Sequence, residues 1–286
     1  MDYTSIWMVI GFFLASYSVI ANDSVQTLGT WIASNNKVNK TIMWAAASAV
    51  LLFTIWFGWY TNGGDISYGR LNKIPFQEIQ WYHALAPAVL LVLTRFGIPV
   101  STSFLVLSAF ASTFILEKML VKSMLGYAVA AVAAYGIWFV VSKFMDESNS
   151  VDDKQRKYWV VAQWVTTGFL WYTWLSHDMA NIAVFLPREI PIEMMFGISA
   201  VFVFGLYWMF REGGGKIQDV VISKHSTKYV RSATLIDLFY FIVLWFFKEL
   251  NDIPMSTTWV FIGLLSGREL AIASFTNKHK FKTVFP

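Results

Sequence analysis

Two short polar motifs recur within apolar sequence in both halves of the chain. Asn22-Asp23 is followed by Gln26, and the second half matches this with His177-Asp178 followed by Asn181. Pro99-Val100-Ser101-Thr102-Ser103 is likewise matched by Pro254-Met255-Ser256-Thr257-Thr258. The two aspartates are 155 positions apart (178 − 23), and the two prolines are also 155 apart (254 − 99). Because independent motif pairs share one offset, the sequence predicts an internal repeat.

The hydroxyl motifs have the chemistry of an oxyanion site. A proline followed by Ser and Thr is typical of a helix start, where hydroxyls cap the helix or turn toward a ligand. Free N–H groups and the positive end of the helix dipole favour an anion at such a start. We therefore expect a tetrahedral oxyanion between two groups of hydroxyls: Ser101, Thr102, Ser103, Ser256, Thr257 and Thr258.

The repeated acids require a positive charge beside such an anion, since carboxylates repel it strongly in a medium of low dielectric constant. Sodium fits, because the motif side chains supply hard oxygen ligands, joined by backbone carbonyls: Asn22, Asp23, Gln26, Asp178 and Asn181. Gln26 and Asn181 are also candidates for contact with the anion. Protonated aspartates would serve the same purpose, and His177, which can titrate near neutral pH, gives this alternative some support.

Simpler interpretations stay open for the same residues. Asp23 and Asp178 could pair with Arg95 or Lys248 without binding an ion, and the hydroxyls could bond only between helices. His177 is a candidate substrate or proton ligand, but it could also be a structural histidine. Arg95 lies one helical turn before Pro99, so it could neutralise the anion, pair structurally or snorkel.

The composition is that of an integral membrane protein. Of the 286 residues, 56% are apolar and only 14% are charged, against roughly 25% charged in soluble domains. The mean hydropathy is +0.51, and there is no cysteine to form a disulfide or a thiolate metal site. A bilayer core of ~30 Å needs about 20 apolar residues per helix. The predicted crossings are Ile6–Ile20, Thr41–Tyr60, Met124–Val141, Tyr158–Leu175 and Ile192–Phe210.

Two further apolar regions, near 85–116 and 233–265, are too long for one span and are interrupted at the prolines. Each could form two spans or a helical hairpin that returns to its own side, with the broken backbone facing a cavity. Hairpins give an all-α polytopic protein with two repeats of inverted topology and broken helices. The predicted units are a first repeat at 1–121, a linking helix with a polar loop at 122–155, and a second repeat at 156–286.

Basic residues support the hairpin version. With both hairpins, most Lys and Arg residues gather on one face, including Lys37, Lys40, Arg156, Lys157, Arg211, Lys216, Lys224 and Lys228, and few remain on the other, including Arg70, Lys73 and Lys122. The positive-inside rule then predicts a cytoplasmic C-terminus and an N-terminus outside, most simply in the plasma (inner) membrane. An amphipathic helix at Ile217–Val230 is expected to lie on the inner surface, with its lysines toward lipid headgroups.

The paired Asn-Asp and Pro-x-Ser-Thr patterns resemble the signatures of the inorganic phosphate transporter family, PiT. The resemblance implies two inverted repeats and symport of inorganic phosphate with sodium or protons, and it suggests a homodimer. The chain departs from the family pattern at Gln26 and His177, where Asn is usual, and at Phe104 and Trp259, where His often stands.

These observations favour secondary active transport of phosphate, with sodium preferred over protons as the coupled cation. Sodium would be a co-transported ligand, and no other cofactor is expected. The alternatives are the same mechanism for sulfate or another oxyanion, and a non-transporting membrane sensor or scaffold on a transporter fold. An enzyme is disfavoured because the histidines show no paired ligand spacing. The expected partners are phosphate, the cation and the lipid bilayer, without nucleic acid.

Overall fold

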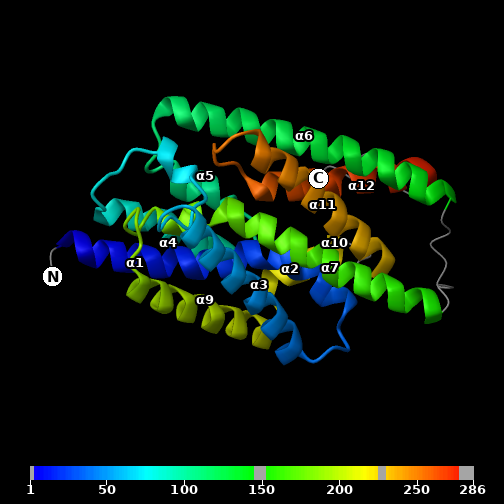
Figure 1. The fold of residues 1–286 in the computed structure, drawn as a ribbon. Helices are drawn as coiled ribbons and strands as arrows, with labels where there is room; N and C mark the ends of the chain where they lie inside the picture. The colour runs from blue at the N-terminus through cyan, green and yellow to red at the C-terminus, as the bar shows by residue number, and fades with distance from the viewer. Residues whose placement is uncertain (1–2, 145–152, 225–229, 277–286) are drawn as a thin grey trace.

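The chain folds into a bundle of helices in the computed structural model, which describes residues 3–144, 153–224 and 230–276 (Figure 1). This described part contains no strand. The polar loop at 145–152 and the basic segment at 277–286 lie outside it, as does the end of the predicted surface helix at 225–229. The elements are α1 Tyr3–Ser18, η1 Val19–Asp23, α2 Ser24–Ser34, α3 Lys40–Thr61, η2 Arg70–Lys73, α4 Trp81–Arg95, α5 Thr102–Leu107, α6 Thr113–Phe144, α7 Asp153–Asp178, α8 Ala180–Ala183, α9 Ile192–Glu212, α10 Gly215–Lys224, α11 Val230–Leu250 and α12 Thr257–Thr276.

Among the described residues, five helical segments are long and apolar enough to cross a membrane, which confirms an integral membrane protein. They are Ile6–Ser34, Lys40–Thr61, Thr113–Phe139, Ile192–Glu212 and Val230–Leu250. Four of them contain or overlap predicted crossings. The predicted crossing at Tyr158–Leu175 lies in α7, which is less apolar because it begins with charged residues and contains polar ones such as Gln163 and Thr167. Both of these polar side chains are buried inside the bundle. Conversely, α11, which the hairpin version treats as one limb of a hairpin, is long enough to cross.

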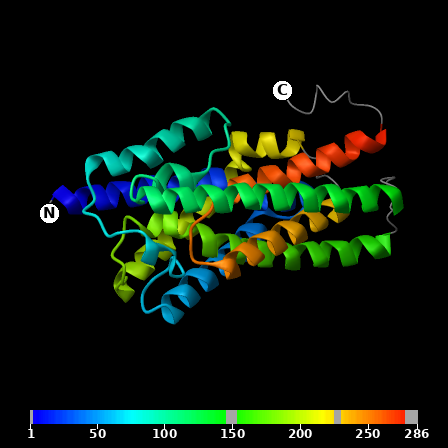
Figure 2. The same cartoon turned by 90° about the horizontal axis from the view of Figure 1, so that it is seen from above.

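The two interrupted regions fold back on themselves. Figures 1 and 2 show α4 running into the bundle and α5 leading back toward the end where α4 began. The same views show α12 returning toward the side where α11 starts. Both turns contain the expected proline, at 96–101 and at 251–256. Two hairpins are therefore present, while the division of the chain into two repeats stays a prediction.

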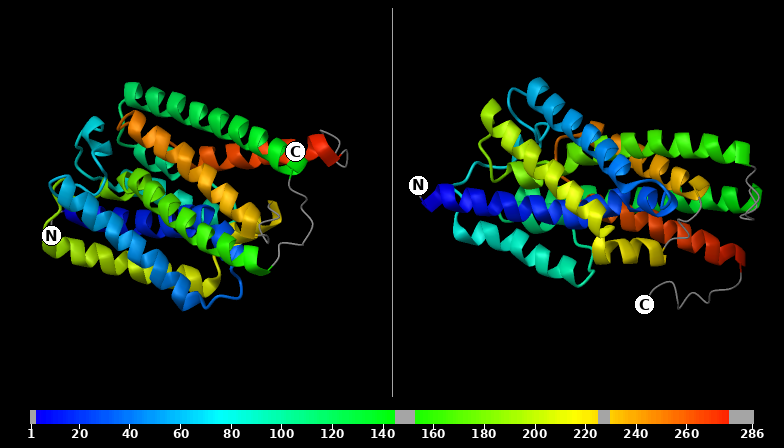
Figure 3. Two further views of the ribbon diagram at one scale, coloured as in Figure 1. Left: turned by 45° about the vertical axis from the view of Figure 1, so that its right-hand side comes forward. Right: turned by 90° about the horizontal axis from the view of Figure 1, so that it is seen from below.

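The second hairpin is packed tightly against α6, with α12 lying alongside it (Figure 3). The packing depends on Gly263 and Gly267 of α12, spaced four residues apart. A Cβ atom at these positions would lie 2.4 Å from the Tyr127 carbonyl oxygen and 2.0 Å from that of Ala131. Small residues at this spacing permit such a close approach of two backbones in a membrane. This close packing holds α12, the second limb of the second hairpin, against α6.

Candidate functional site

The first polar motif lies at a local break in the first membrane helix. Between α1 and α2 the chain widens into the π-helical segment η1, which ends at Asp23. Such segments often occur at functional sites because they displace side chains from the regular helical register. The Asn22 amide donates to Asp23 Oδ1 at 2.6 Å, and Gln26 Nε2 donates to Asn22 Oδ1 at 3.1 Å. All three side chains are buried.

The second motif also lies at a helix break. α7 ends at Asp178, Met179 interrupts the hydrogen-bonded helix, and the short helix α8 begins at Ala180. Asn181 Nδ2 donates to Asp178 Oδ1 at 3.0 Å. The other atom of this amide, Asn181 Oδ1, is buried with no hydrogen-bond partner. A buried oxygen without a donor is an available ligand for a cation.

The hydroxyl motifs start α5 and α12 as the sequence predicts. The first serine of each motif caps its helix: Ser101 Oγ accepts from Phe104 N at 3.3 Å, and Ser256 Oγ accepts from Trp259 N at 3.2 Å. The next residue of each motif turns to an aspartate. Thr102 Oγ1 donates to Asp23 Oδ2, and Thr257 Oγ1 donates to Asp178 Oδ2 at 2.6 Å.

These corresponding contacts have the same separation in the chain, because each threonine follows its aspartate by 79 positions. The third residue of each motif instead connects the two halves. Ser103 Oγ donates to Asp178 Oδ1 at 3.1 Å, and Thr258 Oγ1 donates to the Val100 carbonyl at 3.3 Å. The start of α5 therefore contacts both aspartates through adjacent residues. We call the nine residues that these bonds join, directly or through the Val100 carbonyl, the aspartate cluster: Asn22, Asp23, Gln26, Thr102, Ser103, Asp178, Asn181, Thr257 and Thr258.

Ser256 caps α12 beside this cluster. Its own backbone N–H donates to Ser123 Oγ of α6 at 2.8 Å. Ser256 therefore ties the second hairpin to α6, which agrees with the capping role that the sequence allowed.

His177 faces away from the hydroxyls. Its Nε2 lies 2.9 Å from the Leu244 carbonyl oxygen, and its Nδ1 lies 3.4 Å from Arg70 Nη2. These contacts support the structural interpretation of this histidine. They also bring a buried guanidinium beside the second aspartate motif.

Arg95 and Lys248 do not pair with the aspartates. In the described part of the chain, Lys248 Nζ bonds Glu249 Oε1 at 3.0 Å, and Arg95 lines a separate cavity. The simpler interpretation, in which one of these cations neutralises Asp23 or Asp178, is not what the structure shows. Arg95 also lies outside the aspartate cluster in which it was expected to contact the anion.

Three buried charged residues near the site were not singled out from the sequence. Arg70 enters the bundle from the α3–α4 connection and is 2% exposed. Burial lowers its pKa to about 10, opposed by the carboxylates of Asp252, Asp178 and Asp65, so the guanidinium is charged at neutral pH. No ion pair involves Arg70 among the residues that the structure describes, and its Nε has no hydrogen-bond partner.

Lys122 of α6 holds the tip of the second hairpin. Its ammonium donates to the Asn251 carbonyl and side-chain oxygens, both at 2.9 Å, and to the Ile253 carbonyl at 2.8 Å.

Asp237 of α11 is fully buried and accepts from Thr30 at 2.5 Å and from Thr167 at 2.6 Å. An acid inside the apolar stretch 233–265 was a signal that could have identified Asp237.

Comparison with solved structures finds a similar fold in a protein described as "The sodium-dependent phosphate transporter". The match has a TM-score of 0.63 and covers 99% of this chain and 92% of that one, at 17% sequence identity. The chain has the fold of a phosphate transporter. No protein-family model matches the sequence, and no curated protein matches it either. At this identity the likeness establishes the phosphate-transporter fold, which agrees with the resemblance carried by the repeated motifs.

Proposed function

We propose that the chain is a secondary transporter that carries inorganic phosphate together with sodium across the membrane. The observation that carries this proposal is the aspartate cluster, in which two buried carboxylates receive hydroxyl groups from the starts of two hairpin helices. The likeness to a sodium-dependent phosphate transporter supports it. On this proposal the protein acts by transport and not by catalysis.

The cluster has the donors and acceptors that such cargo needs. Cations would be held by the carboxylates of Asp23 and Asp178 with the amide oxygens of Asn22, Gln26 and Asn181, whose Oδ1 has no partner. Bound sodium would remove the repulsion between the carboxylates and phosphate. The hydroxyls of Thr102, Ser103, Thr257 and Thr258 would then be free to donate to the anion, with Ser101 and Ser256 holding the helix starts.

Charge coupling follows from this arrangement. Without a cation, a buried pair of carboxylates repels an anion, so phosphate binding would depend on bound sodium. By linkage, bound phosphate would raise the affinity for sodium by the same factor. The two hairpins approach the cluster from different halves of the chain, so movement of one against the other would expose it to either side. Protons on the aspartates would give the same coupling, and sulfate would suit the same hydroxyls.

Arg70 adds a fixed positive charge at one side of the cluster. Arg70 lies beside His177, the residue that precedes Asp178 in the chain, and its guanidinium is charged at neutral pH. A buried cation without an ion pair among the described residues would favour an approaching anion. We propose that Arg70 attracts phosphate toward Asp178 from the face of the protein that carries few basic residues.

The orientation proposed for the chain is an N-terminus outside and a C-terminus in the cytoplasm, in the plasma (inner) membrane. Because the face rich in Lys and Arg is expected inside, Arg70 would lie on the outer side of the cluster. A homodimer, suggested by the family resemblance, is a further proposal.

Uptake by the purified protein in liposomes tests the function. Labelled phosphate would be supplied with an inward sodium gradient, an inward proton gradient or no gradient, with sulfate as competitor. Sodium-driven phosphate uptake is the expected result. Proton-driven uptake would show that protons and not sodium are the coupled cation. Sulfate uptake would show that sulfate and not phosphate is the substrate. Ligand binding without any uptake would favour a sensor over a transporter.

A further inference from the structure

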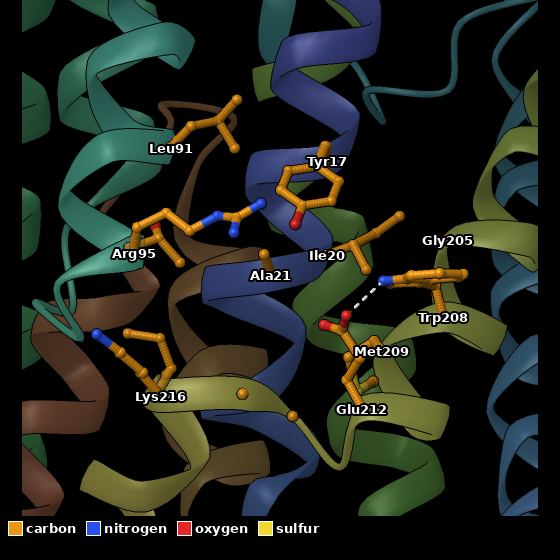
Figure 4. A pocket seen from close by; sticks show the side chains of 14 residues that line it. Tyr17, Ile20, Ala21, Leu91, Arg95, Gly205, Trp208, Met209, Glu212 and Lys216 are labelled. Carbon is orange, nitrogen blue, oxygen red and sulfur yellow. Dashed lines mark hydrogen bonds between the residues drawn. The ribbon is translucent and has the colours of Figure 1, made fainter.

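A cavity of about 210 Å³ lies outside the aspartate cluster, between α1, α4, α9 and α10 (Figure 4). Its walls include Tyr17 and Ala21 from the first membrane segment, Arg95 at the end of α4, Glu212 at the end of α9 and Lys216 at the start of α10. At ~30 Å³ per water molecule, this volume holds several waters or a small polar group with part of its hydration shell.

The cavity carries an excess of positive charge. Arg95 and Lys216 come from different helices, and neither forms an ion pair in the part of the chain that the structure describes. In Figure 4 the Arg95 guanidinium points toward the hydroxyl of Tyr17 across the cavity. The carboxylate of Glu212 is on the far wall and accepts a hydrogen bond from Trp208 Nε1 at 2.8 Å. Two cations against one engaged carboxylate favour an anionic ligand.

The position of the cavity connects it to the transport site. Ile20 and Ala21 line it, and the next residue, Asn22, belongs to the aspartate cluster. The tip of the first hairpin also reaches it, since a Cβ atom at Gly97 would lie 3.4 Å from Lys216 Cβ. Further along α10, Gln218 Nε2 donates to the Gly29 carbonyl of α2 at 2.9 Å. Thus α10 contacts both the tip of the first hairpin and α2, the two segments that carry the first-half residues of the aspartate cluster.

We propose that this cavity is a second oxyanion site, which binds a phosphate group between Arg95 and Lys216. The planar guanidinium suits two phosphate oxygens at once, while the exposed Lys216 of α10, on the same side of the cavity in Figure 4, supplies a point charge. The site contains neither aspartate of the cluster, so it needs no sodium. This proposal goes beyond the transport proposal and can be tested independently of it.

Two sources could supply the same phosphate chemistry. One is free inorganic phosphate on its way between the aspartate cluster and the basic face of the protein. The other is the headgroup of an anionic phospholipid, since Arg95 and Lys216 are both exposed and the cavity opens near the basic face. The experiment therefore needs one arm for each source.

The first arm measures equilibrium binding of labelled inorganic phosphate to the purified full chain in detergent, with choline replacing sodium. Saturable binding is expected, weakened at least about tenfold in Arg95→Gln and in Lys216→Gln, because each removes a charged hydrogen-bond donor. Arg211→Gln is the matched control: its guanidinium lies over Trp208 at 5.7 Å and does not line the cavity. Because choline replaces sodium, this binding does not use the cation site of the aspartate cluster, which separates the second site from the transport proposal.

The second arm measures retention of phosphatidylglycerol on the same proteins by native mass spectrometry, against phosphatidylcholine. Retention that both substitutions at Arg95 and Lys216 abolish, and Arg211→Gln does not, would assign the site to the lipid headgroup. Arg95→Lys and Lys216→Arg should restore most of the binding seen in either arm. The proposal is overturned if neither ligand binds, or if binding is the same in the wild type and both glutamine variants.

Discussion

Thr257→Val removes one hydroxyl from the aspartate cluster and changes little else. Valine has nearly the shape of threonine, and the Thr257 side chain is buried, so the substitution leaves the packing in place. The hydroxyl lost is the one that donates to Asp178 Oδ2 at 2.6 Å. On the proposed function, sodium bound beside Asp178 frees this hydroxyl to donate to the anion.

The size of the effect follows from the hydrogen bond that Thr257 would donate to phosphate. A hydrogen bond to a charged group contributes about 1.5–3 kcal/mol, and each 1.4 kcal/mol is a factor of ten in affinity. Since Thr102, Ser103 and Thr258 would still donate to the anion, we expect the lower end of this range. The phosphate concentration for half-maximal uptake should therefore rise about tenfold.

The assay is initial phosphate uptake into liposomes as a function of external phosphate, at saturating sodium and matched protein density. Thr54→Val is the control, because Thr54 is equally buried but its hydroxyl bonds only the Val50 carbonyl within its own helix. It should not alter the phosphate dependence. A Thr257→Val protein with the phosphate dependence of the wild type would refute the assignment of this hydroxyl to the anion site.

Four other predictions test the surroundings of the site. Asp23→Asn and Asp178→Asn should each abolish sodium-coupled uptake while the protein still elutes as a folded species in size-exclusion chromatography; wild-type uptake in both would remove the acids from the mechanism. Arg70→Gln should weaken phosphate binding at least about tenfold with little change in sodium affinity; because the pKa of Arg70 is about 10, its contribution should be constant between pH 6 and 8 and fall as pH rises through that value. Lys122→Met removes three hydrogen bonds from the second hairpin tip, so amide exchange at residues 251–256 should accelerate, whereas unchanged exchange would show that the lysine does not hold the tip. Gly267→Ala places a Cβ 2.0 Å from the Ala131 carbonyl, and thermal unfolding should show a loss of about 1–3 kcal/mol; equal stability would mean that α6 and α12 separate easily.

Much of the site could be predicted because it depends on local chemistry. Proline followed by Ser and Thr marks a helix start wherever it occurs, and the structure places Ser101 and Ser256 as caps. Acids at membrane depth are costly enough to mark a functional position, and the shared offset of 155 paired the two motifs before any contact was known. The membrane class followed from composition.

The remainder depends on tertiary contacts that a single sequence does not show. Arg70 lies in a polar connection and has the sequence pattern of a solvated cation, yet it is buried against His177. The π-helical segment before Ser24 has no distinctive local pattern. Arg95 was expected beside the anion because it is close to Pro99 in the chain, but the helix end turns it into another cavity.

Binding of labelled phosphate to the purified protein, with and without sodium, tests the central claim most directly. The wild type should show a sodium-dependent component that is absent from both Asp23→Asn and Asp178→Asn. A sodium-dependent component of normal size in either variant would contradict the claim that the two aspartates hold the cation that brings phosphate into the site.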